Sequence, residues 1–332
     1  MRKPPSRELR IAIDTGGTFT DCVWMEGGVL RTLKVFSTPD DPSVAIAEAL
    51  KQIGVRRPLV LLHGTTVGTN ALLQRKGARV ALVTTAGFED AIEIGRQARP
   101  KLYDFFFDRI EPLVAPQLRF GVSERTTSNG KVLQPVSRTE ITALARQIAK
   151  TQPEAVAISL LFSFANPQNE KIVAAGLAKL AVPLSVSHQI LPEFREYERT
   201  STVVVNAYLQ PVMQRYLENL VRRARLIAAS HPARVFVMQS SGGIAALSSA
   251  TREPVRTVLS GPAGGVVGAA AMARRSGFER IISFDMGGTS TDVALVDGEV
   301  QPGAQTEITC LTVAVARLDN HTVDGDGGSL LH

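Results

Sequence analysis

A short phrase built from aspartate, glycine and threonine occurs twice in this chain of 332 residues. Residues 14–21 read DTGGTFTD and residues 285–292 read DMGGTSTD, and each copy follows a short apolar run typical of a strand. Glycine lets main-chain N–H groups approach phosphate oxygens, threonine hydroxyls add donors, and the leading aspartate can hold Mg²⁺. The two copies therefore predict a pair of phosphate-binding hairpins. The alternative is an ordinary glycine-rich turn capped by its own Asp and Thr side chains.

Two further segments have the composition of a ligand-binding turn. Residues 260–265, SGPAGG, open an alanine-rich helix, and a helix N-terminus presents free N–H groups and a positive dipole end to an anion. Close helix packing through small residues explains this segment equally well. Residues 63–70, HGTTVGTN, follow one strand and precede a helix, at the edge where α/β proteins bind ligands. His63 is a candidate proton carrier or orienting donor there, and a buried, hydrogen-bonded histidine is the alternative.

Strand-like and helix-like segments alternate through the first part of the chain, which predicts an α/β fold. Asp41 and Pro42 mark the start of a helix that continues to about residue 53. Ser137 and Glu140 form a capping-box pattern ahead of a helix that reaches about residue 150. A longer helical segment contains Pro211, which should kink or divide it. The runs of strand character are residues 9–13, 58–63, 79–84, 155–161, 235–238 and 280–284.

The length of the chain exceeds the usual limit for one hydrophobic core, so we expect two lobes, residues 8–190 and 200–332. The net charge is +6, but the basic residues are scattered, which favours solvated helix faces over a nucleic-acid surface. No apolar stretch approaches the roughly 20 residues that cross a bilayer, so no membrane partner is expected. Cys22 and Cys310 stand in unrelated contexts, which favours a reduced, cytoplasmic protein.

Five longer phrases lie between and around the hairpins. They are HGTTVGTNALLQRKGARVALVTTAGFEDAIEIGRQ, LPEFREYERTSTVVVNAYLQP, MQSSGG, TVLSGPAGGVVGA and FDMGGTSTDV. Together they resemble the hydantoinase A/5-oxoprolinase family, within the superfamily of actin, hexokinase and heat-shock chaperones. The resemblance covers nearly the whole chain from about residue 8 onward. Sugar and acetate kinases of that superfamily fit the hairpins but not these intervening phrases.

The resemblance implies a fold and an activity. The fold is an actin-like (ribonuclease H-like) ATPase fold of two lobes, with the nucleotide in the cleft between them. ATP phosphorylates the carbonyl oxygen of a cyclic amide such as a hydantoin, 5-oxoproline or a similar lactam, and the activated species is hydrolysed. In the carboxylase branch the substrate is a small ketone. The implied cofactors are ATP and Mg²⁺, and the implied partner is a hydantoinase B-type subunit, a second copy of the chain, or both.

The resemblance also assigns roles to matched positions. Asp14 and Asp285 would bind Mg²⁺ and, with His63, form the catalytic set. The phosphate contacts would come from the two hairpins and from the SGPAGG segment, namely Thr15, Gly16, Gly17, Thr18, Gly261, Gly264, Gly287, Gly288 and Thr289. The resemblance does not transfer the substrate-contacting positions; the first to consider are His63, Thr65, Thr66, Arg96 and Glu196.

Some features depart from the family pattern. Family members continue well beyond this length into an adenosine segment that nothing here matches, so we expect a truncated chain with an incomplete second lobe. Such a lobe should expose apolar surface and either self-associate or need another chain. Asp324 and Asp326 stand at glycine positions of the family, where carboxylates would repel phosphate. Two alternatives therefore stay open: an acetone carboxylase-type ATP-binding subunit, and a non-catalytic truncated nucleotide-binding fragment.

Overall fold

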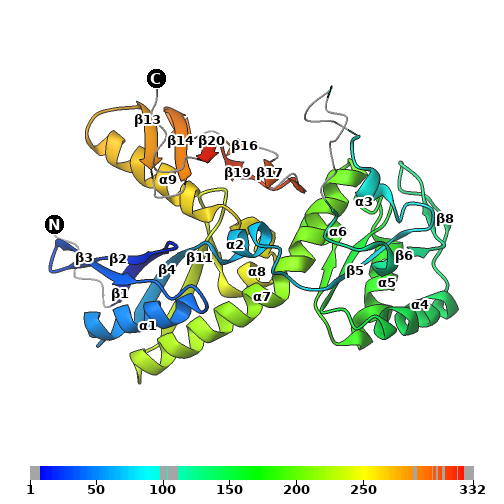
Figure 1. Cartoon of the computed structure of the whole chain (residues 1–332), viewed down its shortest axis with the longest axis horizontal. Coiled ribbons are helices and arrows are strands. Elements are labelled where there is room, and N and C mark those ends of the chain that lie inside the picture. Colours follow the sequence, from blue (N-terminus) through cyan, green and yellow to red (C-terminus); the bar gives the residue numbers. More distant parts are fainter. Residues whose placement is uncertain are drawn as a thin grey trace. The chain divides into compact units, whose positions relative to one another are not determined.

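The structure is a computed structural model in which two compact units are each assembled from separate stretches of the chain (Figure 1). Unit 1 comprises Met1–Asn70, Met213–Ala304 and Ala316–His332, and unit 2 comprises Ala71–Val212 and Gln305–Val315. These two units are interleaved along the sequence. The sequence-based division into two consecutive lobes, residues 8–190 and 200–332, stays a prediction. The structure describes residues 8–97, 103, 111–286, 290–300, 302–303, 306–308, 311–319 and 321–324.

Unit 1 contains a six-stranded mixed sheet in the order β12-β11-β4-β1-β2-β3. Its central strands, β11, β4 and β1, are parallel, and β2, β3 and β12 add antiparallel edges. Alternate residues of β1 are buried, as expected for a strand with one face on a core. The bounds are β1 Leu9–Thr15, β2 Phe19–Glu26, β3 Val29–Phe36, β4 Leu59–Thr65, β11 Ala233–Met238 and β12 Ile244–Ala246.

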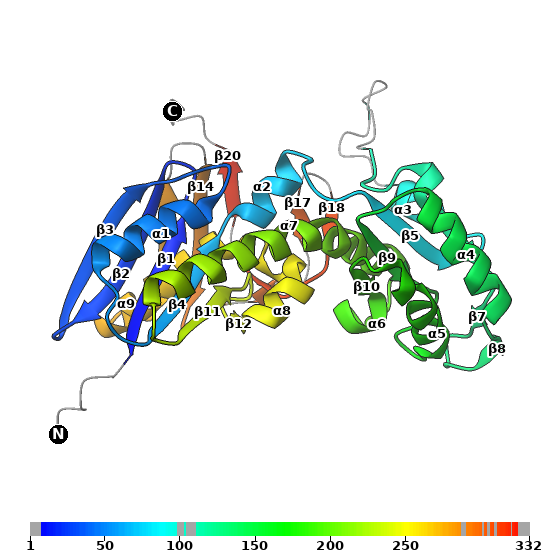
Figure 2. The ribbon, with the colours of Figure 1, turned by 90° about the horizontal axis from the view of Figure 1, so that it is seen from below.

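One face of this sheet is covered by α1 (Pro42–Ile53) and by the C-terminal part of α7 (Glu196–Ala228), as Figures 1 and 2 show. The expected start of α1 is confirmed, because the Asp41 side chain accepts a hydrogen bond from the Ser43 N–H at 3.1 Å. The same carboxylate pairs with Arg223 of α7 at 3.2 Å. The cap of one helix is therefore also an attachment point for the other.

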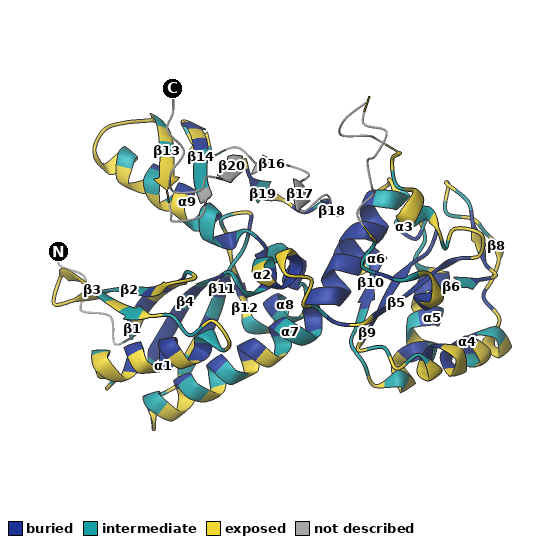
Figure 3. Cartoon of the chain, viewed as in Figure 1, coloured by how far each residue is buried: buried dark blue, intermediate teal, exposed yellow. Residues whose placement is uncertain are grey.

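A second sheet of unit 1 is formed by β13 (Arg280–Met286), β14 (Ser290–Asp297), β15 (Glu299–Val300) and β20 (His321–Asp324). The helix α9 (Ser260–Arg275) packs on one face through a small core that includes Ala263, Val266, Ala294 and Val296. The expected exposure of apolar surface is confirmed on the opposite face (Figure 3). Its exposed side chains, each between 63% and 71% accessible, are Ile282, Phe284, Met286 and Leu295.

Unit 2 is built on a parallel sheet in the order β10-β9-β5-β6. Every residue of β5 and β9 is buried, the pattern of parallel strands covered on both faces (Figure 3). The covering helices α4 and α5 contribute to the core beneath the sheet. The bounds are β5 Val80–Thr85, β6 Arg119–Val122, β9 Ala155–Ser159, β10 Leu184–Val186, α4 Arg138–Lys150 and α5 Gln168–Leu177.

The remaining elements are short and connect or extend these layers. The helices are α2 (Val67–Leu73), α3 (Ala91–Ile94), α6 (Ser187–Ile190) and α8 (Leu247–Arg252), with 3₁₀ turns at Pro116–Leu118, Ala178–Leu180 and Pro254–Thr257. The strands are β7 (Arg125–Thr126), β8 (Val132–Gln134), β16 (Pro302–Gly303), β17 (Thr306–Ile308), β18 (Leu311–Val313) and β19 (Arg317–Leu318). Within the described part of the chain, no helix is long and apolar enough to cross a membrane.

Two local expectations are corrected in part or in full. The helix α7 contains Pro211 within one element of 33 residues, so the proline does not divide it, and the expected kink stays a prediction. A proline in a helix interior removes one N–H donor, which a helix can accommodate by bending rather than ending. The capping box at α4 is not formed either. Ser137 accepts no capping hydrogen bond, and the Glu140 carboxylate instead accepts one from the Ser123 N–H at 2.6 Å.

Candidate functional site

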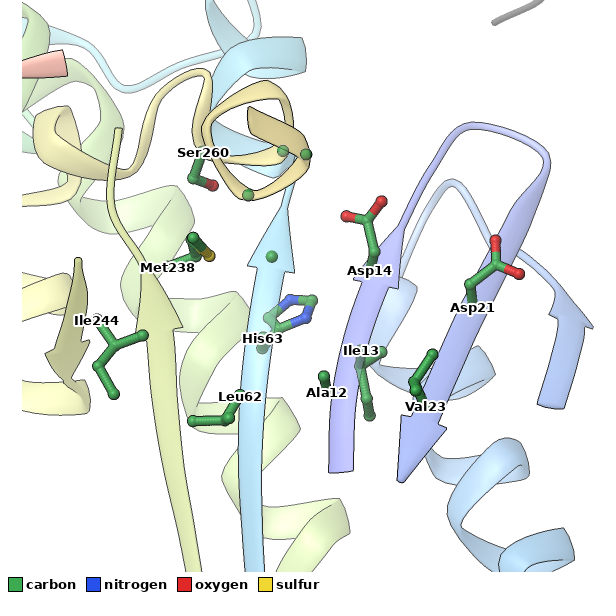
Figure 4. Close-up of a pocket in the computed structure, with 14 residues that line it drawn as sticks. Ala12, Ile13, Asp14, Asp21, Val23, Leu62, His63, Met238, Ile244 and Ser260 are labelled. Atoms are coloured by element: carbon green, nitrogen blue, oxygen red, sulfur yellow. The ribbon is translucent and has the colours of Figure 1, made fainter. Parts of the chain in front are cut away.

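A pocket of about 330 Å³ opens in unit 1 near the carboxyl ends of β1 and β4 (Figure 4). Asp14 lies at the end of β1, across the pocket from Ser260 at the start of α9. The polar rim thus combines a carboxylate at a strand end with the first turn of a helix. The lining also includes Asp21, His63, Gly64, Gly261, Gly264 and Gly265, over an apolar floor that contains Ile13, Val23, Leu62, Met238 and Ile244.

Asp14 is held where its negative charge is poorly solvated. It pairs in register with Asp21 on β2 and with Gly64 on β4. Burial raises the pKa of the Asp14 carboxyl above its ordinary value, and the nearby carboxylates of Asp21 and Asp285 raise it further. A cluster of this kind favours a proton or a cation. The position of Asp14 is therefore suited to bind a divalent metal.

Gly64 makes room for this carboxylate. A Cβ built on Gly64 would lie 3.0 Å from Asp14 Oδ1, which is closer than ordinary van der Waals contact. The parallel register of β1 and β4 sets this approach, because it places Asp14 directly beside Gly64. A larger residue here would therefore displace the carboxylate of a residue 50 positions earlier in the sequence.

The turn after β1 is ordered by hydrogen bonds of its own. The Gly16 N–H donates to the Phe19 carbonyl at 2.9 Å, and the Ser37 hydroxyl donates to the Gly16 carbonyl at 2.8 Å. Space is open around the Cβ position of Gly17. Asp14 lines the pocket, whereas the lining contains none of the four following residues that the sequence predicted as phosphate contacts, Thr15, Gly16, Gly17 and Thr18. Their predicted role depends on a ligand that extends beyond the pocket along this turn.

The second copy of the phrase lies in the same unit. Asp285, near the end of β13, is exposed, and its Oδ2 atom lies 4.0 Å from the Cβ position of Gly265 on α9. Asp285 is close enough to affect the pKa of Asp14. The structure therefore brings the two predicted metal-binding aspartates into one region. The rest of the predicted second turn, Gly287, Gly288 and Thr289, lies outside the described residues, as does Asp326, while Asp324 contributes its backbone to β20.

The first turn of α9 has no side-chain cap. Leu259 precedes it in a left-handed conformation, with φ of 60°, and its N–H donates to Thr69 Oγ1 at 3.0 Å. Ser260 and Gly261 of this first turn line the pocket, and the N–H groups at the start of a helix have no intrahelical acceptor, so this end of α9 is suited to an anion. The alternative of close packing also holds in part, because the Cβ position of Gly264 lies 3.4 Å from the Met238 sulfur.

His63 is buried and engaged with a tyrosine. Its Nε2 atom lies 2.6 Å from the Tyr216 hydroxyl, and its Nδ1 atom has no hydrogen-bond partner among the described residues. Burial lowers the pKa of His63 to about 4, so the imidazole is neutral near pH 7. A proton carrier works best when its pKa is near the working pH. The geometry thus favours an orienting role for His63 over a proton-carrying one.

Apart from His63, the four positions considered for substrate contact do not gather in one place within either unit. Thr65 and Thr66 belong to unit 1, where the Thr66 hydroxyl donates to the Thr15 carbonyl at 3.1 Å and Thr65 Oγ1 accepts from the Val67 N–H. These hydroxyls bind backbone groups at the end of β1 and at the start of α2. Arg96 and Glu196 belong to unit 2 and line a different pocket.

Sequence reasoning missed Tyr216 and Gly64 as parts of this site. Tyr216 lies in the middle of a long helix, and no local pattern pairs it with His63. Gly64 had a usable signal, because it follows His63 at the end of a predicted strand. Aligning the ends of the strands β1 and β4 as parallel neighbours would have placed it beside Asp14.

Known proteins share this sequence and architecture. The hydantoinase/oxoprolinase N-terminal region matches residues 10–180, and the hydantoinase/oxoprolinase domain matches residues 199–332. The caprolactamase subunit alpha of Pseudomonas jessenii is 34% identical over 98% of this chain and 49% of its own length. The 5-oxoprolinase 1 of Arabidopsis thaliana is 33% identical over 98% of this chain and 28% of its own.

Solved structures agree with these sequence matches. The ATP-dependent caprolactamase from Pseudomonas jessenii superposes with a TM-score of 0.85, at 34% identity, over 97% of this chain and 49% of its own. Nucleotide-free acetone carboxylase superposes with a TM-score of 0.84, at 26% identity, over 96% of this chain and 48% of its own. The chain spans about half the length, or less, of the relatives it matches. On this evidence the chain belongs to the hydantoinase/oxoprolinase family.

Proposed function

We propose that this chain carries the nucleotide site of an ATP-dependent enzyme that opens a cyclic amide, such as a hydantoin, 5-oxoproline or a similar lactam. The observation that carries the proposal is the pocket of unit 1, where Asp14 faces the uncapped first turn of α9. A carboxylate for a metal ion and N–H groups for phosphate oxygens lie on opposite sides of one space. Relatives named caprolactamase and 5-oxoprolinase support the class of reaction.

The residues at the pocket fit Mg²⁺. Burial raises the pKa of Asp14 and the carboxylates of Asp21 and Asp285 raise it further; a divalent cation would neutralise this charge. Among the described residues there is no group of three or more metal-binding side chains, and Mg²⁺ is typically held by one or two carboxylates with waters and substrate phosphates. Asp14 and Asp285 would hold this ion. Bound there, it would neutralise charge on the phosphates during phosphoryl transfer.

The backbone of this chain would hold the phosphates. The first turn of α9 offers N–H groups without a side-chain cap, and space is open around the Cβ position of Gly261. On the other side, the hairpin after Asp14 would contribute the N–H groups of Gly17 and Thr18, while the Gly16 N–H, which donates to the Phe19 carbonyl, would hold the turn in shape. We propose the same role for Gly287, Gly288 and Thr289 of the second hairpin. When bound, ATP would supply the phosphoryl group whose transfer to the amide oxygen activates the carbonyl carbon toward attack by water.

His63 and Tyr216 would position the end of β4 rather than move a proton. His63 directly precedes Gly64. Loss of its hydrogen bond to Tyr216 would therefore shift the end of β4 that faces Asp14. Phosphoryl transfer depends chiefly on positioning and on neutralising charge. A rigid strand end beside the metal-binding carboxylate meets the first of these requirements.

The same pocket could serve a ketone substrate, because acetone carboxylase is structurally similar to this chain. In both reactions a carbonyl oxygen would accept the phosphoryl group. A B-type subunit or a second copy of this chain would complete the enzyme, in keeping with a relative that is itself named as an alpha subunit. The non-catalytic alternative keeps the nucleotide site without turnover.

Calorimetric titration of Mg·ATP into this chain tests the proposal. We expect binding that Asp14→Asn and Asp285→Ala each weaken at least tenfold. Asp40→Asn is the matched control, because Asp40 is exposed and does not line the pocket. The absence of binding to the wild-type chain would contradict the proposed site. With a B-type subunit added, ADP release that requires a lactam supports the hydrolase, release that requires a ketone supports the carboxylase, and binding without turnover supports the non-catalytic fragment.

A further inference from the structure

The parallel sheet of unit 2 has a topological switch point. From β5 the chain continues to β6 on one side, whereas from β9 it continues to β10 on the other side. The connections that leave the carboxyl ends of β5 and β9 therefore diverge. In open α/β sheets a crevice forms at such a point, and ligands bind there.

A pocket of about 460 Å³ lies among residues that follow these strand ends. Phe162 and Phe164 come directly after β9, and Arg96 comes after β5 and α3. The start of α7 and the residues before it complete the lining with Phe194, Arg195, Tyr197, Glu196 and Glu198. The volume is that of a small-molecule site. None of these residues lines the Asp14 pocket, so this is a separate space.

Two carboxylate oxygens of this pocket are buried without a donor. The Glu198 side chain is 5% exposed, and its Oε1 accepts from Arg96 Nε at 2.7 Å, but its Oε2 has no hydrogen-bond partner among the described residues. Glu196 Oε1 is also buried; it forms an ion pair with Arg199 Nη2 at 3.6 Å but has no closer hydrogen-bond donor among the described residues. A buried acceptor without a donor costs free energy. Both oxygens therefore favour a ligand with several N–H donors.

The same pocket contains an available cation. The Arg195 guanidinium lies 5.5 Å from the centre of the Phe194 ring and makes no ion pair with any described residue. Arg195 has φ of 75° and Phe162 has φ of 53°, so two lining residues without a glycine's freedom are held in the left-handed region. Strained backbone of this kind occurs preferentially at ligand clamps and active sites. The Arg195 guanidinium is suited to bind a carboxylate.

The charges and surfaces of the lining define the ligand class. Two arginines and two glutamates line the pocket, and the buried Arg199 lies behind them, 3.6 Å from Glu196. A zwitterion matches the Arg195 guanidinium, which has no ion pair among the described residues, together with two carboxylate oxygens that lack a donor; the phenylalanine rings offer contact for an apolar side chain. We propose that this pocket binds a small apolar α-amino acid, with its ammonium group at Glu196 and Glu198 and its carboxylate at Arg195. Opening a cyclic amide creates an amine and a carboxylate in one molecule, so if the proposed function holds, the pocket also fits the chemical class of the product.

Calorimetry on the full chain, with no nucleotide present, tests the proposal with L-phenylalanine as the probe. Two analogues each lack one charged group: 2-phenylethylamine has no carboxylate, and 3-phenylpropanoate has no ammonium. We expect saturable binding of L-phenylalanine and at least tenfold weaker binding of each analogue. No saturable binding of L-phenylalanine at low-millimolar concentration, or equal binding of the analogues, would overturn the proposal.

Single substitutions separate the two ends of the ligand. Arg195→Asn keeps a residue that tolerates the left-handed conformation, and it should weaken L-phenylalanine at least tenfold while leaving 2-phenylethylamine unchanged. Glu196→Gln should weaken both of these ligands but not 3-phenylpropanoate. Arg146→Gln on the exposed face of α4 is the matched control. If circular dichroism shows that a variant does not fold, the comparison of L-phenylalanine with its two analogues on the wild-type chain still tests the proposal. These titrations contain no ATP, so a failure to bind L-phenylalanine would not contradict the proposed nucleotide site. A failure to bind Mg·ATP would likewise not contradict the proposed amino-acid site.

Discussion

The Nε2 atom of His63 lies 2.6 Å from the hydroxyl oxygen of Tyr216, which is 153 residues further along the chain. Both side chains are buried, and the pair joins the end of β4 to the middle of α7 within unit 1. His63 is followed directly by Gly64, which faces Asp14. The hydrogen bond between His63 and Tyr216 thus helps to fix the position of the end of β4, which lies beside the candidate metal ligand Asp14.

Loss of the tyrosine hydroxyl should destabilise the protein. Tyr216→Phe leaves His63 Nε2 buried without a partner, which typically costs about 1–3 kcal/mol. Tyr208→Phe is the matched control, since Tyr208 is also a buried tyrosine of α7 but has no hydroxyl hydrogen bond among those described. Urea unfolding measures both changes in free energy. Equal losses in the two variants would contradict the importance of the His63–Tyr216 bond.

The neutral His63 should make stability depend on pH below neutrality. Burial lowers the pKa of His63 to about 4, while an unfolded histidine titrates near 6.5. The unfolded chain therefore binds more protons between these values, and the free energy of unfolding falls as the pH drops from about 6.5 to 4. The contribution of this group is at most about 3 kcal/mol.

A non-titrating variant isolates this effect. The stability of the wild type relative to His63→Asn should fall between pH 7 and pH 4, and it should be flat above pH 7. Urea unfolding at a series of pH values measures this difference, in which shifts of other groups, including Asp14, cancel. A constant difference across the range would show that His63 is not held neutral.

A methyl group at position 64 should disturb the metal site more than the fold. In Gly64→Ala the new Cβ would lie 3.0 Å from Asp14 Oδ1, so the carboxylate must move. We expect Mg·ATP affinity to fall at least tenfold in calorimetry. Gly268→Ala is the control, because it adds a methyl group in open space on α9 and should raise stability by about 0.5–1 kcal/mol without affecting nucleotide. Unchanged affinity in Gly64→Ala would argue against Asp14 as the metal ligand.

Removal of the Asp14 charge should have opposite effects on the stability of the folded protein and on its affinity for Mg·ATP. Because the pKa of this carboxyl is raised by burial and by two other carboxylates, its ionised form is unfavourable in the folded protein at neutral pH. Asp14→Asn should therefore raise the melting temperature in metal-free buffer and abolish the further rise that Mg·ATP produces in the wild type. Thermal scans with and without Mg·ATP measure both effects. A lower melting temperature in metal-free buffer would show that the charge is stabilised by contacts other than a metal.

Local patterns in the sequence predicted the parts of the structure that depend on near neighbours. Asp41 caps α1 as expected, because an N-cap requires only a side chain and an N–H two residues later. Asp14 and Asp285, which open the two repeated phrases, lie near the ends of β1 and β13, as the preceding apolar runs predicted. The capping box at Ser137 failed because Ser123, from another element, provides the hydrogen bond that Glu140 accepts.

By itself, the sequence determined the family, the α/β class and the positions of the two aspartates. Tertiary structure alone decided that a residue larger than Gly64 would displace the Asp14 carboxylate, that Tyr216 partners His63, and that the pKa of Asp14 is raised. Each of these depends on burial and on contacts between residues distant in the chain. The pocket around Arg195 has the same origin, since its two carboxylate oxygens without a hydrogen-bond donor are buried only where the strand ends of unit 2 meet the start of α7. Local sequence sets backbone propensity and chemical type, whereas the electrostatics of a side chain are set by whatever folds against it.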